Sequence, residues 1–286
     1  MEFNACKYLE KTKRVPRAIN LDRELNMAIY EWIDGMPIKK VENRHILEAL
    51  SFTNYLWNHA QSLKSSIIPL ASEACLSRQQ LFSQIESRYA RLIERSELIE
   101  NLRIFLESTF KPIWKLALDW AKNYWPDENI KKELPQKERT LSPSDFGFHN
   151  TLERTDGSLC FLDLEYFGFD DPVKLITDFI WHPAMSLSAD QKKFWVEESI
   201  NIFGKTEKIQ ERILAAWPVI GLRWSLILLN EFLKEGWEKR VHAKKDIIEF
   251  RDKKLKKQLS KSKSICEFIM KHKMKCPYIQ FESISL

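Results

Sequence analysis

Glycine is scarce in this sequence, with 7 residues among 286, where a typical protein has roughly 7%. The seven glycines form no G-x-G-x-x-G pattern, so the usual glycine-rich loop that cradles nucleotide phosphates is absent from the sequence. The five cysteines are widely spaced and form no C-x-x-C pair, which argues against a zinc ribbon and gives a disulfide scaffold no support.

The sequence also lacks a long uninterrupted hydrophobic run. Its N-terminus carries charges where a signal peptide needs an apolar core. The most apolar stretch, residues 217–233, is interrupted by Arg223, Asn230 and Glu231, so it is too short and too polar for a membrane span. This stretch is typical of a buried helix. We therefore expect a protein of the reducing cytoplasm.

What the sequence does contain is enough hydrophobic material for a substantial core, at 44% of its residues. The net charge is only +5, so we expect no nucleic-acid partner for the protein as a whole. The basic excess lies late, because residues 239–263 carry eleven Lys or Arg and three Asp or Glu. This segment is typical of a solvated amphipathic helix, and a peripheral contact with an acidic partner or membrane surface is the alternative.

Hydrophobic periodicity predicts an α+β fold that is mostly helical. Residues 1–14 should form a charged helix, which ends before Pro16 because a residue that precedes proline is pushed out of the helical region. Helices should dominate residues 41–125 and return from Pro172 to about residue 272. The polar, proline-containing segment 126–140 between them should be a loop.

Strands are few and short in this prediction. Residues 27–33 (MAIYEWI) form an apolar and aromatic run that Asp34-Gly35 closes, which favours a strand and a turn. Residues 151–154 and 158–162 should form two strands around Asp156-Gly157, a dipeptide that favours a two-residue hairpin turn.

The predicted hairpin suggests a metal site. If Asp156 and Gly157 are the two turn residues, Asn150 faces Asp163, and opposed residues have Cβ atoms about 4.5–5.5 Å apart. An amide and a carboxylate at that distance could converge on Mg²⁺ bound jointly with substrate phosphates. Leu152 shares a face with Asn150 and could supply an apolar floor beside the metal.

Asp145 lies five residues before Asn150, in the loop that leads into the hairpin. An Asp, four residues, an Asn, a tight hairpin and a second Asp form the arrangement of kinase catalytic loops. Taken singly, each of these residues would usually be a turn or cap residue, and that remains the alternative. Together they predict a phosphotransferase.

The sequence motifs around these residues make this prediction more specific. LSPSDFGFHNTL, followed by FLDLEYFGFDDPVKLITDFIWHP, resembles the aminoglycoside phosphotransferase and choline kinase superfamily. Its members usually read H-G-D-x-H-x-x-N-(I/V)-L and then I-D-(F/W)-E-x-(A/S)-x-x-G-D-P-x-x-D-L-A. The resemblance implies a protein-kinase-like large lobe with a catalytic-loop β-hairpin. It also implies an ATP- and Mg-dependent kinase that acts on a hydroxyl of a sugar, an amino alcohol or an aminoglycoside-like compound.

The resemblance also implies roles for individual residues. Asp145 corresponds to the catalytic base that orients the acceptor hydroxyl. Asn150 and Asp163 correspond to the Mg²⁺ ligands, and Glu165 to the acidic residue of the D-x-E word, near the second metal.

A nucleotide site is implied in the same way. The segment AIYEWIDG resembles the last small-lobe strand and the hinge, so that backbone groups around Glu31, Trp32 and Ile33 would bond the adenine edge. Leu152 would lie beneath the adenine. An edge strand without a ligand is the alternative for the hinge segment.

Other positions match the pattern as supports or depart from it. Asp171 and Asp178 match G-D-P-x-x-D, where the last Asp braces the catalytic loop from a helix start. Pro143 and Gly147 stand where the family has its two histidines, and His149 is shifted next to Asn150. His149 is either a packing residue of the loop or a group near the phosphates.

A kinase small lobe normally carries a glycine-rich strand pair and a lysine-bearing strand, and residues 1–26 contain no glycine. We therefore expect residues 1–35 to be a remnant of the small lobe with the hinge. Residues 36–286 should form a helical large lobe, with the catalytic motifs between 140 and 183. The chain is either a fragment of a longer kinase or a naturally shortened protein. Correspondingly, it is either an active phosphotransferase or a kinase-like binding or regulatory protein without turnover.

Overall fold

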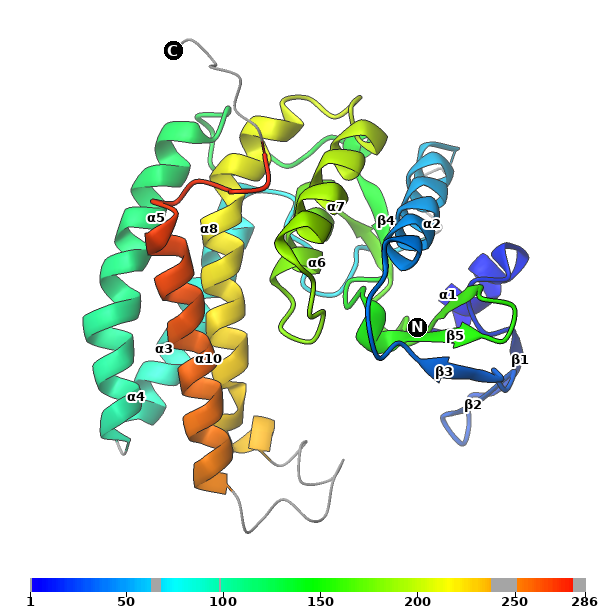
Figure 1. The fold of residues 1–286 in the computed structure, drawn as a ribbon, viewed down its shortest axis with the longest axis horizontal. Coiled ribbons are helices and arrows are strands. Elements are labelled where there is room, and N and C mark those ends of the chain that lie inside the picture. Colours follow the sequence, from blue (N-terminus) through cyan, green and yellow to red (C-terminus); the bar gives the residue numbers. More distant parts are fainter. Residues whose placement is uncertain (1, 63–67, 98, 238–250, 280–286) are drawn as a thin grey trace. The chain divides into compact units, whose positions relative to one another are not determined.

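The structure, a computed structural model, describes residues 2–62, 68–97, 99–237 and 251–279 (Figure 1). The chain divides into two compact units. The first comprises residues 1–76, 133–209 and 278–286, and the second comprises residues 77–132 and 210–277. The boundary expected after residue 35 lies within the first unit.

The N-terminal segment forms the predicted helix, as α1 (Glu2–Leu9) and a 3₁₀ turn η1 (Glu10–Thr12) that ends at Lys13 in the left-handed region. A hairpin of β1 (Ala18–Asp22) and β2 (Met27–Tyr30) follows. The predicted strand at 27–33 therefore ends at Tyr30. Beyond it, the Glu31 N–H still donates to the Arg17 carbonyl at 2.9 Å, which extends the pairing by one bond.

A second, three-stranded antiparallel sheet has the order β3-β5-β6, with strands Gly35–Pro37, Thr151–Arg154 and Leu159–Phe161. The predicted hairpin is confirmed, but its register is wrong by one residue. Thr151 pairs with Phe161, and the turn holds three residues, with Gly157 at φ +82°. Three-residue turns that end on a left-handed glycine compete with the two-residue turn that we expected. Asn150 therefore faces Leu162, whose N–H donates to the Asn150 carbonyl at 2.8 Å.

A third sheet joins the two segments that carry the motifs. Strand β4 (Thr140–Ser142) pairs with β7 (Gly168–Asp170), so that Ser142 lies beside Gly168. Neither strand was predicted, because each has only three residues. At Gly168 an added Cβ would collide with the backbone of Leu70 and Ala71, which pack directly against this strand.

Aromatic side chains form the core of the first unit beneath the motif loop. Phe146 contacts the rings of Phe52, Phe161 and Phe179, and Phe179 stacks on Trp195 at 3.7 Å between ring centroids. These contacts fix the loop after β4 on its supporting helices. The helices are α2 (Asn43–Ser62), α6 (Pro172–Trp181) and α7 (Ala189–Ile202). Single 3₁₀ turns, η3 (Gln136–Glu138) and η4 (Phe148–Asn150), precede and end the loop region.

The second unit is helical, as predicted. It contains α3 (Arg78–Ser96), α4 (Glu100–Phe105), a π-helical turn η2 (Leu106–Phe110), α5 (Lys111–Tyr124), α8 (Ile209–Ile227, whose first residue belongs to the first unit), η5 (Leu228–Phe232) and α10 (Arg251–Lys271). Residues 209–232 form a helix long and apolar enough to cross a membrane, but 89% of its apolar window is buried, which agrees with the predicted core helix. Helix α10 packs on α8 through a bond from Ser262 Oγ to the Ser225 carbonyl. Of the basic segment 239–263, residues 239–250 lie outside the described residues.

Candidate active site

Asp145 and Asn150, the two ends of the kinase-like loop, are in contact. Asp145 lies in the turn between β4 and η4, with 35% of its side chain exposed. The Asn150 amide Nδ2 lies 3.3 Å from Asp145 Oδ2 and 3.2 Å from the Asp145 carbonyl oxygen, and donates to both. The amide oxygen of Asn150, at the opposite edge of the planar amide group, is thereby directed away from these two acceptors.

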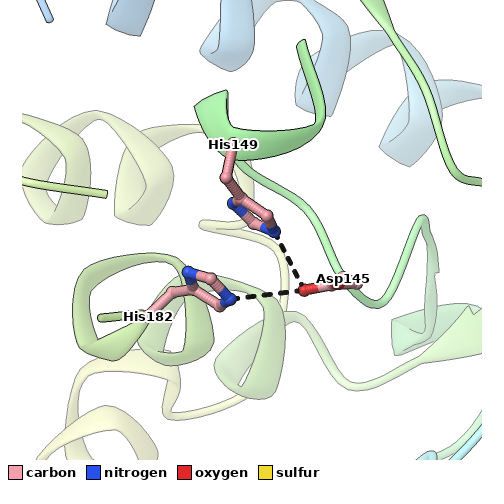
Figure 2. A group of neighbouring side chains, drawn as sticks. All are labelled: Asp145, His149 and His182. Carbon is pink, nitrogen blue, oxygen red and sulfur yellow. Dashed lines mark hydrogen bonds and ion pairs between the residues drawn. The ribbon is translucent and has the colours of Figure 1, made fainter. Parts of the chain in front are cut away.

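Two histidines converge on the other oxygen of the same carboxylate (Figure 2). His149 Nε2 lies 3.2 Å from Asp145 Oδ1, and His182 Nε2 lies 3.5 Å from that atom. The two imidazoles stack on each other, with centroids 3.9 Å apart and planes inclined by 6°. Asp145 is thus held on both carboxylate oxygens.

The tautomer of His182 follows from its second nitrogen. Its Nδ1 accepts the Ala184 N–H at 3.2 Å, so the proton of the neutral ring lies on Nε2, facing Asp145. Burial, together with the charge of His149, lowers the pKa of His182 to about 4, so this ring is neutral near pH 7.

The nitrogens and carboxylate oxygen of Asp145, His149 and His182 lie within 4.8 Å of one another, a spacing that a metal ion could use. A metal-bound histidine donates its other N–H, whereas His182 accepts there, which favours a hydrogen-bonded cluster.

The charge of Asp145 is stabilised in this position. Burial raises the pKa of Asp145, but the hydrogen bond and charge of His149, the electrostatic influence of His182 and the Asn150 amide outweigh it. The net pKa lies below the usual range, so Asp145 is a carboxylate near pH 7.

Local packing explains why the sequence departs from the family pattern in this loop. An added Cβ at Gly147 would clash with the Met185 sulfur and lie 2.9 Å from His149 Nδ1. The Phe148 N–H donates to the Met185 sulfur, and Thr151 Oγ1 donates to the Gly147 carbonyl. Position 147 therefore has no room for a histidine, and His149 reaches Asp145 instead.

The residues predicted as magnesium ligands are not opposed across the hairpin as expected. Asp163 follows Leu162, the neighbour of Asn150, and has a backbone φ of +59°. Burial raises the pKa of Asp163, and the negative charges of Glu165 and Asp145 raise it further. Carboxylates that interact in this way are a donor set that fits Mg²⁺, because the cation would offset their mutual repulsion.

The predicted nucleotide residues lie on neighbouring segments. Strand β3, which directly follows Glu31, Trp32 and Ile33, pairs with β5 so that Pro37 lies opposite Leu152. Ile33 is buried, whereas Trp32 is 88% exposed. The Glu31 N–H already bonds the Arg17 carbonyl, which leaves this donor unavailable to an adenine ring.

Asp171 and Asp178 lie at the start and near the end of α6. Asp171 caps the helix, because its carboxylate accepts the Val173 N–H at 2.8 Å. Asp178 pairs with the Lys174 ammonium at 2.9 Å, and that ammonium also lies 3.1 Å from Asp170. Lys174 is only 3% exposed, so it is a buried cation between two carboxylates. Asp178 thus stabilises α6, from whose C-terminus His182 projects.

Sequence reasoning did not identify His182 or Lys174, because neither has a motif spacing that would single it out. It also did not identify a pocket of about 430 Å³ that His149 lines together with residues 38–41, 148, 184–186, 188 and 191. Adjacent lysines at 39 and 40 were its only sequence signal.

Comparison with known proteins identifies solved structures with a similar fold. No family model and no curated protein matches the sequence. Among solved structures, a choline/ethanolamine kinase family protein from Mesorhizobium loti matches with a TM-score of 0.53 and 14% identity, over 93% of this chain and 78% of that one. An aminoglycoside phosphotransferase from Alicyclobacillus acidocaldarius matches with a TM-score of 0.52 and 12% identity, over 94% and 82%.

The ADP-bound aminoglycoside phosphotransferase APH(2'')-Ib matches with a TM-score of 0.52 and 15% identity, over 93% of this chain and 82% of that one. At such identities the likeness concerns the fold. The resemblance seen in the motifs is therefore confirmed at that level. This chain has the kinase-like fold that is found in choline kinases and aminoglycoside phosphotransferases.

Proposed function

We propose that this protein is a phosphotransferase that moves the γ-phosphoryl group of ATP to a hydroxyl of a small molecule. The observation that carries the proposal is Asp145, an ionised carboxylate held by Asn150 on one oxygen and by His149 and His182 on the other. A fold shared with small-molecule kinases supports the same reading.

In this proposal Asp145 acts as the base. Phosphoryl transfer requires mainly positioning and electrostatic stabilisation, and the acceptor hydroxyl must be aimed at the phosphorus. The contacts on Asp145 hold its carboxylate in one orientation, so it can accept the hydroxyl proton as the new bond to phosphorus forms.

Asn150, Asp163 and Glu165 would hold magnesium. Bound Mg²⁺ neutralises charge on the transferred phosphoryl group. Of the three, Asn150 contributes its amide oxygen, because its Nδ2 is directed to Asp145. Asp163 and Glu165 would contribute carboxylates; burial and the charge of Glu165 raise the pKa of Asp163. Residues 31–33, which precede β3, and Leu152 on β5 would form the adenine side of the site.

The test compares Asp145→Asn with the unchanged protein. The measurement is transfer of radiolabelled phosphate from ATP to a panel of choline, glucose, glucosamine and glucuronate. Because Asn keeps the size of Asp but cannot accept the proton, we expect a loss of about 10²–10⁴-fold in rate. Binding of MgADP, measured by calorimetry, should change little, since Asp145 would contact the acceptor.

Asp163→Asn provides the complementary variant. Asparagine tolerates the left-handed backbone at this position, so the hairpin should fold. We expect weaker MgADP binding and lower turnover, because a carboxylate ligand is lost. Full activity of Asp145→Asn would refute the assignment of the base. MgADP binding without transfer to any acceptor would instead favour a kinase-like binding protein.

A further inference from the structure

A pocket of about 430 Å³ lies in the same unit as Asp145. His149 belongs both to the pocket wall and to the cluster that holds Asp145 Oδ1 at 3.2 Å. Its volume is in the range of small-molecule sites. A molecule in this pocket would therefore contact His149, which itself contacts the proposed base.

The charged residues that line this pocket are basic. Its polar lining residues are Lys39, Lys40, His149, two serines and Gln191. The lining contains neither Asp nor Glu. The remaining lining side chains, such as Phe148 and Met185, are apolar.

The two lysines are available to a ligand. Within the part of the chain that the structure describes, neither Lys39 nor Lys40 takes part in an ion pair. The neighbouring carboxylate of Glu42 is bound by Arg44 at 2.9 Å, and Arg44 also bonds Glu153 at 2.7 Å. These two carboxylates are thus paired with another cation. Two exposed ammonium groups with no counter-charge attract an anion and repel a cation.

Gln191 and Ser188 keep the pocket wall in place. Their side chains form a reciprocal cap at the start of α7, and Gln191 Nε2 also donates to the Val41 carbonyl at 3.0 Å. This last bond ties α7 to the segment that carries Lys39 and Lys40. The fold therefore holds the backbone of the segment that carries the two lysines.

We infer that the acceptor of this protein is an anionic hydroxyl compound, carrying a carboxylate or a phosphate, and that Lys39 and Lys40 bind its charged group. The inference rests on the proposed function, because it assigns this pocket to the acceptor. A cationic acceptor such as choline or an aminoglycoside would meet two like charges there.

The test measures binding of three pyranoses that differ mainly in charge: glucuronate, glucose and glucosamine. Calorimetric or ligand-observed NMR titration of the full chain, in the presence of MgADP, should show that glucuronate binds about 5–20-fold more tightly than glucosamine. The preference should shrink at high salt, because the lysines are exposed.

Charge reversal identifies the residues. The double variant Lys39→Glu/Lys40→Glu should lose the preference for glucuronate or invert it. The matched control is Lys256→Glu/Lys257→Glu, which reverses an adjacent exposed pair on α10 and should keep the preference. Glucose 6-phosphate serves as a second anion, to distinguish a phosphate-binding from a carboxylate-binding pocket.

Several outcomes would overturn the inference. These are equal binding of the three sugars, tighter binding of glucosamine, no binding of either anion, or equal effects of the two double variants. If Lys39→Glu/Lys40→Glu weakened MgADP binding as much as it weakened glucuronate binding, the lysines would be assigned to the nucleotide instead. The proposed function can fail separately. Anion binding without phosphoryl transfer refutes the function but keeps the assignment of the pocket to an anion. Transfer to glucosamine alone supports the function but refutes that assignment.

Discussion

A single carboxylate with three partners dominates the candidate site at the scale of residues. His149 and His182 meet Asp145 on one oxygen and Asn150 meets it on the other. Because the Nδ1 atom of His182 accepts a backbone N–H, its Nε2 proton must point towards Asp145. The base is thus oriented by a neutral imidazole, which lends a proton to the contact without adding a full charge beside the reacting hydroxyl.

His182 should make stability depend on pH. Its pKa is about 4 in the folded protein and near 6.5 in an unfolded chain, so the unfolded state takes up a proton first as the pH falls. The stability that the neutral ring provides is complete above about pH 6.5 and is lost towards pH 4, at a cost of up to about 3 kcal/mol. The free energy of unfolding of His182→Asn, measured in urea, should therefore fall less steeply over this range.

His59→Asn is the control for this pH series, since it removes an imidazole that stacks on Tyr55 and makes a tilted contact with Tyr8 in the same unit. It should retain the steep dependence. Identical slopes for His182→Asn and the unchanged protein would contradict the assigned protonation state.

At the scale of elements, the β5–β6 hairpin and helix α6 hold the two motif segments. The hairpin turn depends on Gly157, whose φ of +82° is costly for residues with a Cβ. We expect Gly157→Ala to reduce the free energy of unfolding by about 1–2 kcal/mol in urea denaturation. Gly157→Asn should lose less, because asparagine tolerates the left-handed region. Equal losses would show that the turn relaxes into another geometry.

Helix α6 depends on its buried cation. Lys174→Met would leave the carboxylates of Asp170 and Asp178 without that ammonium, and removing one partner of a buried ionic group typically costs about 3–5 kcal/mol. Lys193→Met is the matched control, because Lys193 pairs with Glu197 on the surface of α7 at 3.7 Å. Its effect should stay below about 1 kcal/mol. A similar small loss for Lys174→Met would refute the supporting role of the triad.

At the scale of the whole molecule, the two compact units each have their own buried thiols. Cys6, Cys75 and Cys160 belong to the first unit, and Cys266 and Cys276 belong to the second. Burial raises the pKa of Cys6 and Cys266 to about 12 and that of Cys160 to about 11. Only the thiolate reacts readily with disulfide reagents, so the native protein should react poorly.

We expect the native thiols to be modified at least about 100-fold more slowly than those of the denatured chain. Thiol labelling across a urea series, read by mass spectrometry of peptides, would measure this. If the units unfold independently, the three cysteines of the first unit should become reactive together, and the two of the second unit together. Rapid labelling of Cys6 in native buffer would contradict the packing around α1.

The sequence predicted the helical content and the hairpin, because both depend on local features. Periodicity defines helices, and a turn dipeptide defines a hairpin. The error in the hairpin register arose because the prediction used local sequence features alone. Asp156-Gly157 is compatible with turns of two and of three residues, and the choice depends on how the flanking strands pack.

The tertiary structure alone decided the rest. Strand β4 pairs with β7 across 28 residues, His182 approaches Asp145 from the end of α6, and residues 38–41 share a pocket with residues 184–191. None of these contacts has a sequence signature, because each depends on side chains that pack between distant segments, such as Phe146 against Phe179. The sequence by itself therefore determined which groups are available for chemistry. The packing of the core decided which of them meet, because burial of apolar surface brings distant segments together without regard to their polar residues.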